Sequence, residues 1–196
     1  KNKWNLSSAT VIAKKIQREV WQETGLTCSA GVSYNKFIAK IASDFRKPAG
    51  MTVITPNDAA RFLRELPIEK FYGVGKKTVE KMKLLGIHSG DDLYLFDQSE
   101  LLSQFGKHGY ILYQRVRGID NRPVEPERER KSIGKEHTFT LFLTDEEQVR
   151  LELKQIALAV QVALHNNKLH GRSIVLKIRY ADFDTITRRK TRIDHF

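Results

Sequence analysis

The chain has 196 residues, of which 40% are hydrophobic and 29% charged, and Cys28 is its single cysteine. This composition is typical of an ordered globular protein and not of a disordered chain. The length is enough for one large domain or two to three small ones. No apolar run in the sequence approaches the roughly 20 residues of a membrane span. A single cysteine excludes an intramolecular disulfide and a CxxC metal site. With no secretory leader recognisable at the start, we expect a reducing, cytoplasmic compartment.

Basic residues outnumber acidic ones. Lys and Arg total 34 and Asp and Glu 23, for a formal net charge of +11. A surplus of this size favours a polyanionic partner such as nucleic acid. A merely basic soluble protein would have the same composition, because net charge alone identifies no partner.

The first section alternates helix and strand. Residues 7–23 have helical apolar spacing, and Gly25 suits the end of a helix. Residues 26–32 are nearly uncharged and predict a fully buried strand of a parallel sheet. A helix capped by Ser33 and a strand at 51–55 follow, so the order predicts part of an α/β layer. Two strands make too small a sheet, so either partner strands come from elsewhere or the chain is a segment of a longer protein.

The helix after Ser33 has two unlike faces. One face is apolar, and the opposite face carries Lys36, Lys40, Ser43 and Lys47 at spacings i, i+4, i+7 and i+11. Periodicity by itself favours a solvated lysine face.

Residues 55–120 predict a small all-helical domain, with two of its short helices starting at Ser89 and Ser99. Within it, residues 70–83 contain five lysines and one acid. Gly73-Val74-Gly75 permits positive φ and leaves backbone amides bare at the start of the helix from Lys76, which predicts a phosphate site. With the closing "LLGI" at 84–87, the stretch resembles a helix-hairpin-helix motif. The alternative is a simple helical turn beside solvated lysines.

The last section is α+β. Residues 121–131 lack apolar periodicity and predict a linker. A strand at 136–143, a helix with a Thr144–Glu147 capping box, and strands at 173–180 and 185–192 give the order β-α-β-β. The first of the two later strands alternates apolar and polar residues, so we expect one of its faces to be buried and the other to face solvent. The order matches an incomplete ferredoxin-like domain, and both chain ends look cut.

Residues 31–54, "GVSYNKFIAKIASDFRKPAGMTVI", resemble a motif of the Y-family DNA polymerases, the translesion enzymes, of the bacterial polymerase IV type. The hairpin follows at the distance expected of the family's thumb, residues 130–139 resemble the opening of its little finger, and residues 176–191 its inner hairpin. The resemblance covers essentially the whole chain. The catalytic subunit of polymerase V shares most of these motifs, so that type is an alternative assignment.

The resemblance implies an α+β multi-domain chain: the end of the palm at 1–54, the thumb at 55–120, the linker at 121–131 and a truncated little finger at 132–196. It implies that Lys47 contacts the triphosphate of the incoming nucleotide, whereas Asp44 makes local pairs and is no metal ligand. Lys36 and Lys40 receive no role. The predicted DNA contacts are Gly73, Val74, Gly75, Lys76, Lys77, Arg130, Lys131, Ser132, Ile133, Gly134, Thr185, Thr187, Arg188 and Arg189.

The implied reaction uses two Mg²⁺ ions held by clustered carboxylates. In the family these lie in an N-terminal Asp motif and a Ser-x-Asp-Glu motif, and neither motif occurs in this sequence. We therefore expect no catalytic residue and no metal ligand in this chain, which would bind primer–template DNA but not extend it. The finger domain and the tail that holds the sliding-clamp motif are also expected elsewhere in the parent protein, which would act at the bacterial nucleoid. The competing hypothesis is a non-catalytic DNA-binding accessory protein.

Overall fold

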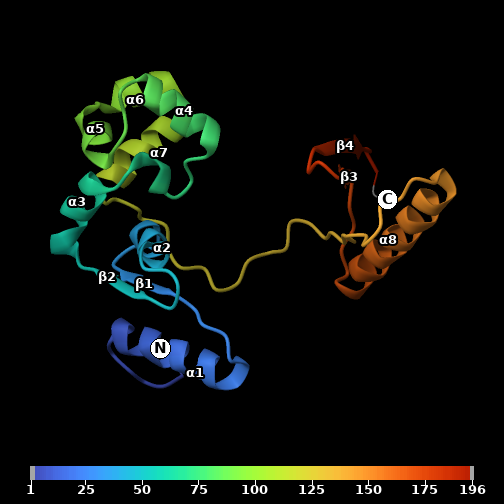
Figure 1. Ribbon diagram of the computed structural model, residues 1–196, viewed down its shortest axis with the longest axis horizontal. Helices are drawn as coiled ribbons and strands as arrows, with labels where there is room; N and C mark the ends of the chain where they lie inside the picture. Colours follow the sequence, from blue (N-terminus) through green and yellow to red (C-terminus); the bar gives the residue numbers. More distant parts are fainter. Residues whose placement is uncertain (1–2, 195–196) are drawn as a thin grey trace. The chain divides into compact units, whose positions relative to one another are not determined.

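The structure is a computed structural model that describes residues 3–194. The chain divides into two compact units, residues 1–125 and 126–196, which are described separately (Figure 1). The division falls inside the stretch predicted to be a linker. No helix within residues 3–194 combines the length and the apolar character that crossing a bilayer requires.

The first unit opens with the predicted helix–strand–helix–strand order. Its elements are α1 (Ala9–Thr24), β1 (Ala30–Ser33), α2 (Lys36–Phe45) and β2 (Met51–Ile54). The two strands are parallel, with Ala30 opposite Met51 and Ser33 opposite Ile54. Both helices contact β1, and they lie on opposite sides of the sheet (Figure 1).

The first predicted strand is shorter and less buried than expected. It starts at Ala30 rather than at residue 26, and all four of its residues are half-buried. Residues 26–29 have no partner in β2, because β2 begins opposite Ala30. The Gln17 side chain instead donates to the Cys28 carbonyl oxygen at 2.7 Å, so a side chain of α1 replaces a ladder bond there.

The cap of α2 also differs from the prediction. Asn35, not Ser33, is the N-cap, and its side-chain oxygen accepts from the Ile38 amide at 2.9 Å. Ser33 is still part of β1, where its hydroxyl donates to the Ile54 carbonyl oxygen at 2.9 Å. An amide side chain both caps and reaches further than a serine hydroxyl, and Asn35 uses that reach in the site described below.

The following stretch is all-helical, as predicted. It comprises α3 (Pro56–Glu65), the 3₁₀ turn η1 (Ile68–Lys70), α4 (Lys76–Leu84), α5 (Gly90–Leu95), α6 (Gln98–Phe105) and α7 (Lys107–Val116). Ser89 caps α5 as expected, within a capping box. The cap of α6 is Asp97 and not Ser99, since the Asp97 carboxylate accepts from the Glu100 amide at 2.8 Å.

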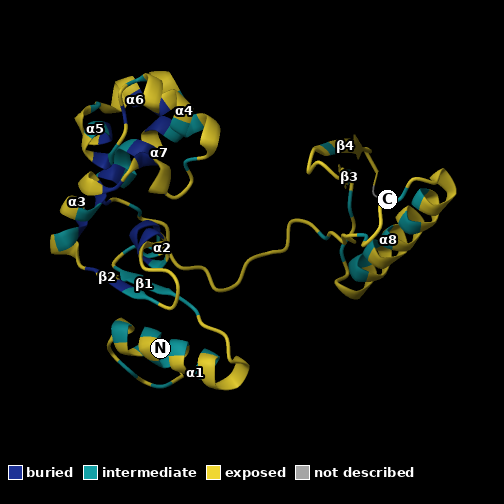
Figure 2. Cartoon of the chain, in the orientation of Figure 1, coloured by how far each residue is buried: buried dark blue, intermediate teal, exposed yellow. Residues whose placement is uncertain are grey.

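One hydrophobic core runs from α2 through the helical stretch. Phe37, Ile38, Ile41 and Ala42 of α2 are buried together with residues of every element from β2 to α7 (Figure 2). The Phe37 and Phe71 rings lie 6.0 Å apart between centroids. The core therefore crosses the predicted palm–thumb boundary at 54/55, which stays a prediction, and it holds α2 and the hairpin in one body.

The second unit contains α8 (Glu146–Asn166), β3 (Ser173–Arg179) and β4 (Thr185–Thr191). The strands are antiparallel, with Ser173 opposite Thr191 and Arg179 opposite Thr185. Asp145, not Thr144, caps α8 by accepting from the Gln148 amide at 2.9 Å, so the predicted capping box does not form.

Two further expectations for this unit are wrong. Residues 136–143 form no strand, although their composition has high β propensity. A strand exists only when its backbone is paired, and here no partner strand lies beside them among residues 126–194. Both faces of β3 are exposed, instead of one being buried and the other facing solvent, since Ile174 is 53% and Val175 56% exposed. Without a covering layer, no residue of 126–194 is buried (Figure 2).

Candidate nucleic-acid interface

A cluster of charged side chains lies at the C-terminal end of α2. The ammonium groups of Lys40 and Lys47 each form an ion pair with the Asp44 carboxylate. Hydrogen bonds from Lys40 and Lys47 lower the pKa of Asp44 below its ordinary value. The predicted local pairing of Asp44 is thereby confirmed, and this carboxylate stays ionised at neutral pH.

These side chains border a surface hollow. Its lining is rich in hydroxyl and ammonium groups and comprises Thr27, Ser29, Lys40, Ser43, Asp44, Lys47, Pro48 and Ala49. The Lys47 side chain is 61% exposed there. Hydroxyl and ammonium donors are the groups that bind phosphate oxygens, so the hollow has the chemistry that the predicted role of Lys47 requires.

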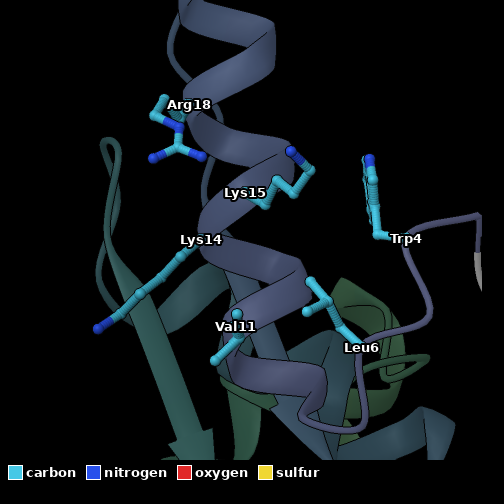
Figure 3. A pocket seen from close by; sticks show the side chains of 6 residues that line it. All are labelled: Trp4, Leu6, Val11, Lys14, Lys15 and Arg18. Carbon is cyan, nitrogen blue, oxygen red and sulfur yellow. The ribbon is translucent and has the colours of Figure 1, made fainter.

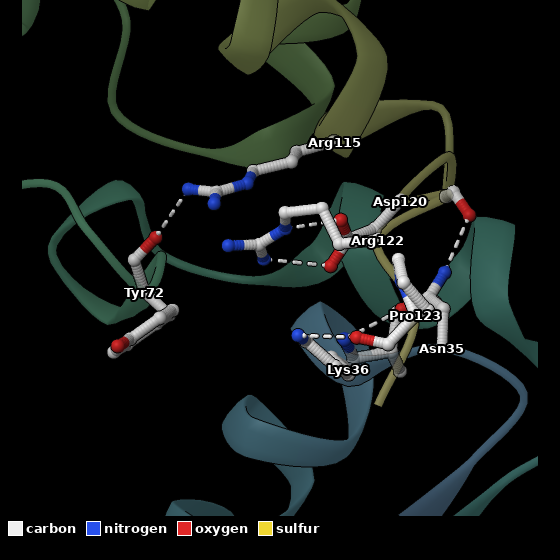
Figure 4. Close-up of polar contacts among 9 residues, drawn as sticks. Asn35, Lys36, Tyr72, Arg115, Asp120, Arg122 and Pro123 are labelled. Carbon is white, nitrogen blue, oxygen red and sulfur yellow. Dashed lines mark hydrogen bonds and ion pairs between the residues drawn. The ribbon is translucent and has the colours of Figure 1, made fainter. Parts of the chain in front are cut away.

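Lys36 lies apart from this cluster. Its ammonium group donates to the Pro123 carbonyl oxygen at 2.7 Å (Figure 4). The three lysines that share one helical face in sequence therefore have two different surroundings. Lys40 and Lys47 share a carboxylate, whereas Lys36 fixes the chain that follows α7.

The two hairpin positions are occupied by glycine for different structural reasons. Gly73 has φ +92°, in the region that favours glycine. Gly75 has φ −84° and is the N-cap of α4, and a Cβ built on it would meet no atom within 4 Å. The backbone conformation at Gly75 therefore does not require glycine. The absence of a side chain there leaves the N-terminus of α4 open.

The charge at this helix end is unusual. The first turn of α4 contains no acidic residue, and Lys76 and Lys77 occupy it, both exposed. Cations are unfavourable near the positive end of a helix dipole. Open amides, the dipole and two ammonium groups together suit an anion such as a backbone phosphate.

An arginine that the sequence analysis did not identify connects the hairpin to α2. Arg115 of α7 donates to the Tyr72 carbonyl oxygen at 3.1 Å (Figure 4), and its guanidinium lies 5.0 Å from the centroid of the buried Phe37 ring. Burial lowers the pKa of Arg115. The contact joins residues 43 positions apart, so no local pattern could have revealed it.

Tyr72 also meets the lysine cluster, because the Lys40 ammonium lies 5.7 Å from the centroid of its ring. Asn35 and Tyr34 donate to the Gly118 carbonyl oxygen at 2.8 and 2.9 Å. The predicted triphosphate lysine and the predicted DNA-backbone loop thus lie on one packed body, connected through Lys40 and Tyr72.

The segment after α7 contains a paired carboxylate. Arg122 donates to both oxygens of Asp120 at 2.6 and 2.7 Å (Figure 4), and the Asp120 side chain is only 5% exposed. The hydrogen bond from Arg122 lowers the pKa of Asp120. The Lys36–Pro123 bond and the bonds from Tyr34 and Asn35 to Gly118 fix the path of residues 118–123 beside α2.

In the second unit, the predicted contacts on β4 are all exposed: Thr185, Thr187, Arg188 and Arg189. The Arg189 guanidinium donates to the Ser173 hydroxyl at 3.0 Å across the hairpin. Residues 130–134 form an irregular segment in which Ile133 alone is half-buried and the others are exposed. These positions are accessible to a ligand, and their role in DNA binding stays a prediction.

A second hollow lies along α1 and has no counterpart in the sequence analysis. Trp4, Leu6, Val11, Lys14, Lys15 and Arg18 line it (Figure 3). The ammonium groups of Lys3 and Lys15 lie 4.7 and 5.2 Å from the centroid of the Trp4 ring. Of the basic side chains that line the hollow, Lys15 thus lies against the indole.

The described residues do not fit a two-metal site. No group of three or more His, Cys, Asp or Glu side chains that could hold a metal ion occurs within residues 3–194. Asp44, the carboxylate nearest the predicted triphosphate lysine, is already paired with two lysines.

Comparisons with known proteins agree with this geometry. Residues 2–44 match the impB/mucB/samB family, residues 56–87 the IMS family HHH motif, and residues 130–195 the impB/mucB/samB family C-terminal domain. Among solved structures, a Y-family DNA polymerase chimera of Dbh and Dpo4 matches with a TM-score of 0.76 and 28% identity, over 94% of this chain and 53% of that one.

Curated relatives point the same way. The chain is 50% identical over 190 residues to a protein named DNA polymerase IV from Streptococcus agalactiae serotype Ia, and 53% identical to one of the same name from Streptococcus mutans serotype c. Each match covers 97% of this chain, with 52% and 51% of the respective relative. The chain therefore spans about half the length of these relatives. Three consecutive family matches and these identities show that the chain belongs to the impB/mucB/samB family of Y-family DNA polymerases.

Proposed function

We propose that this chain is the DNA- and triphosphate-contacting part of an error-prone translesion DNA polymerase of the polymerase IV type. The observation that carries the proposal is the open, lysine-flanked N-terminus of α4 at Gly75, held on the same core as the α2 helix that leads to Lys47. The shared name of the curated relatives favours this type over polymerase V.

In this proposal a backbone phosphate of the duplex binds the amides at the open N-terminus of α4, from Gly75 onward, with the Lys76 and Lys77 side chains beside it. The Val74 amide stays bonded to the Phe71 carbonyl oxygen. Residues 130–134 and the exposed side chains of β4 contact the template backbone. Contacts of this kind position a duplex and carry no sequence information. Binding is therefore non-specific and falls steeply as salt concentration rises.

Lys47 exchanges its ion pair with Asp44 for the triphosphate of the incoming nucleotide. A flexible ammonium suits a group that must later leave as pyrophosphate. Lys40 remains as the partner of Asp44, so the carboxylate does not repel the arriving phosphates. The ion pairs of Asp44 with both lysines support this exchange.

The metal ions of the reaction, which we take to be Mg²⁺, neutralise charge on the triphosphate when they are bound. Since residues 3–194 do not fit such a site, we assign its ligands to other parts of the parent polymerase. The proposed partners are primer–template DNA, a deoxynucleoside triphosphate and, for the whole protein, a sliding clamp. The proposed location is the bacterial cytoplasm, at the nucleoid.

The hairpin proposal is tested by Gly75→Val. The position has room for a side chain and an ordinary φ, so the variant should fold while its isopropyl group covers the open helix end. We expect duplex affinity to fall about tenfold, equally for several unrelated sequences, because each lost charge-assisted contact is worth roughly 1.5–3 kcal/mol. Fluorescence anisotropy at several salt concentrations measures this.

Gly171→Val serves as the matched control, since a Cβ there also meets nothing within 4 Å and the position lies outside the predicted contacts. It should leave affinity unchanged. A loss in Gly75→Val that depends on DNA sequence would contradict backbone recognition. Equal affinity of Gly75→Val and the unsubstituted chain would remove the hairpin from the interface.

A further inference from the structure

We infer that Arg115 is a positioning residue that fixes the Gly73–Gly75 loop against α2 and so sets the geometry in which the loop meets DNA. The inference rests on the proposed DNA binding at the hairpin. It concerns how the loop is held, and Arg115 itself is not assigned a contact with DNA.

Arg115 connects three elements through one side chain. It extends from α7, and its Nη1 donates to the Tyr72 carbonyl oxygen at 3.1 Å (Figure 4). Its guanidinium lies over the Phe37 ring of α2, 5.0 Å from the ring centroid. Phe37 is fully buried, so the platform under the guanidinium is rigid. Tyr72 directly precedes the loop, so the bond fixes the peptide from which the loop turns.

The loop itself is built around this contact. The Val74 amide donates to the Phe71 carbonyl oxygen at 3.1 Å and closes the turn that contains Tyr72. A Cβ on Gly73 would lie 3.0 Å from Nη1 of Arg115. Glycine is therefore needed at this position for its positive φ, and it also leaves room for the guanidinium.

The chemistry favours arginine over lysine. A planar guanidinium can stack flat on an aromatic ring and donate in its own plane in one fixed geometry, whereas an ammonium is a compact point charge without such a plane. Arg115 is half-buried, which favours the more weakly hydrated guanidinium. Lysine at this position would keep the net charge and lose the combined geometry.

The experiment compares Arg115→Ala, Arg115→Lys and the charge-matched control Arg61→Ala in the full 196-residue chain. Arg61 is a 75% exposed side chain of α3, paired with Asp58. We expect Arg115→Ala to weaken duplex binding about tenfold and Arg115→Lys to recover only a minor part of the loss. Arg61→Ala should change affinity less than twofold.

A second measurement does not involve DNA. Hydrogen exchange at the Val74 amide should become faster in free Arg115→Ala and Arg115→Lys but not in Arg61→Ala, because the turn loses its anchor. If Val74 exchange is unchanged in Arg115→Ala, the inference is wrong.

A double-mutant cycle with Gly75→Val distinguishes positioning from general destabilisation or direct DNA contact. If Arg115 acts through the loop, Arg115→Ala should cause no further loss of affinity in the Gly75→Val background. If the fold-losses of DNA affinity caused by the two substitutions multiply in the double variant, the inference is wrong. Full recovery of affinity in Arg115→Lys would also overturn it. If the unsubstituted chain fails to bind duplex DNA, the proposed function falls, and the Val74 exchange rate alone decides whether Arg115 fixes the loop.

Discussion

At the scale of single residues, Asp44 is the ion-pair partner of Lys47. The carboxylate binds Lys40 and Lys47 together, and its lowered pKa keeps it charged across the neutral range. Exposed ion pairs are worth only about 0–1 kcal/mol, so the proposed move of Lys47 to a triphosphate would cost little. Lys40 would then keep the carboxylate neutralised.

The proposed role of Lys47 predicts a selective defect. In the full-length polymerase, Lys47→Ala should lower catalytic efficiency for nucleotide by about 10- to 100-fold, because one charge-assisted bond to phosphate is lost. Affinity for primer–template should change less than twofold. Steady-state extension at varied nucleotide concentration, with separate DNA-binding titrations, measures both quantities.

Lys14→Ala on α1 removes the same charge away from the Asp44 cluster and should leave both quantities near their original values. If Lys47→Ala instead lowers DNA affinity as much as nucleotide use, Lys47 contacts DNA rather than the triphosphate.

At the scale of elements, α2 shows what the sequence pattern could and could not predict. The apolar period correctly predicted that Phe37, Ile38, Ile41 and Ala42 are buried, because burial follows the 3.6-residue repeat. It was wrong for Phe45, which shares that face and is 56% exposed at the end of the helix. The pattern could not identify the cap, since Ser33 and Asn35 are both good N-cap residues. The choice depends on β1, which includes Ser33 through its pairing with Ile54, and on Gly118, which lies 83 residues from Asn35.

Asn35 therefore has two separable functions. Asn35→Ala should lower the free energy of unfolding of the first unit by about 2 kcal/mol, through loss of the α2 cap and of the bond to Gly118. Asn35→Ser keeps a cap but cannot reach Gly118, so its loss should be about 1 kcal/mol. Urea unfolding followed by tryptophan fluorescence reports on this unit, because both tryptophans, Trp4 and Trp21, lie in it. Equal stability of the two variants would mean that the Gly118 bond contributes nothing.

At the scale of the whole molecule, local motifs were predictable and long-range contacts were not. The Gly73–Gly75 turn and the lysines beside it follow from residue types within a few positions. The Arg115–Tyr72 bond and the Lys36–Pro123 bond join segments 43 and 87 residues apart, and a single sequence contains no record of such pairings. The strand predicted at 136–143 failed for the same reason, since a strand depends on a partner that its own composition does not specify.

The chain as a whole should bind DNA without extending it. Its net charge of +11 and the exposed basic positions on both units favour duplex binding, with an affinity that falls steeply with salt. Nucleotidyl transfer requires clustered carboxylates for metal ions, and residues 3–194 offer no such group. We therefore expect the purified chain to bind a primer–template with all four nucleotides and Mg²⁺ present and to leave the primer unextended, as measured by anisotropy and by gel analysis in the same reaction.

The full-length polymerase is the positive control for extension, and Gly75→Val in the isolated chain is the control for binding through the hairpin. Mg²⁺-dependent extension by the isolated chain that persists after repeated purification would show that the metal ligands lie within it. Absence of both binding and extension would contradict the assignment of DNA contacts to the hairpin, because those contacts depend only on residues whose positions are fixed by the core of the first unit.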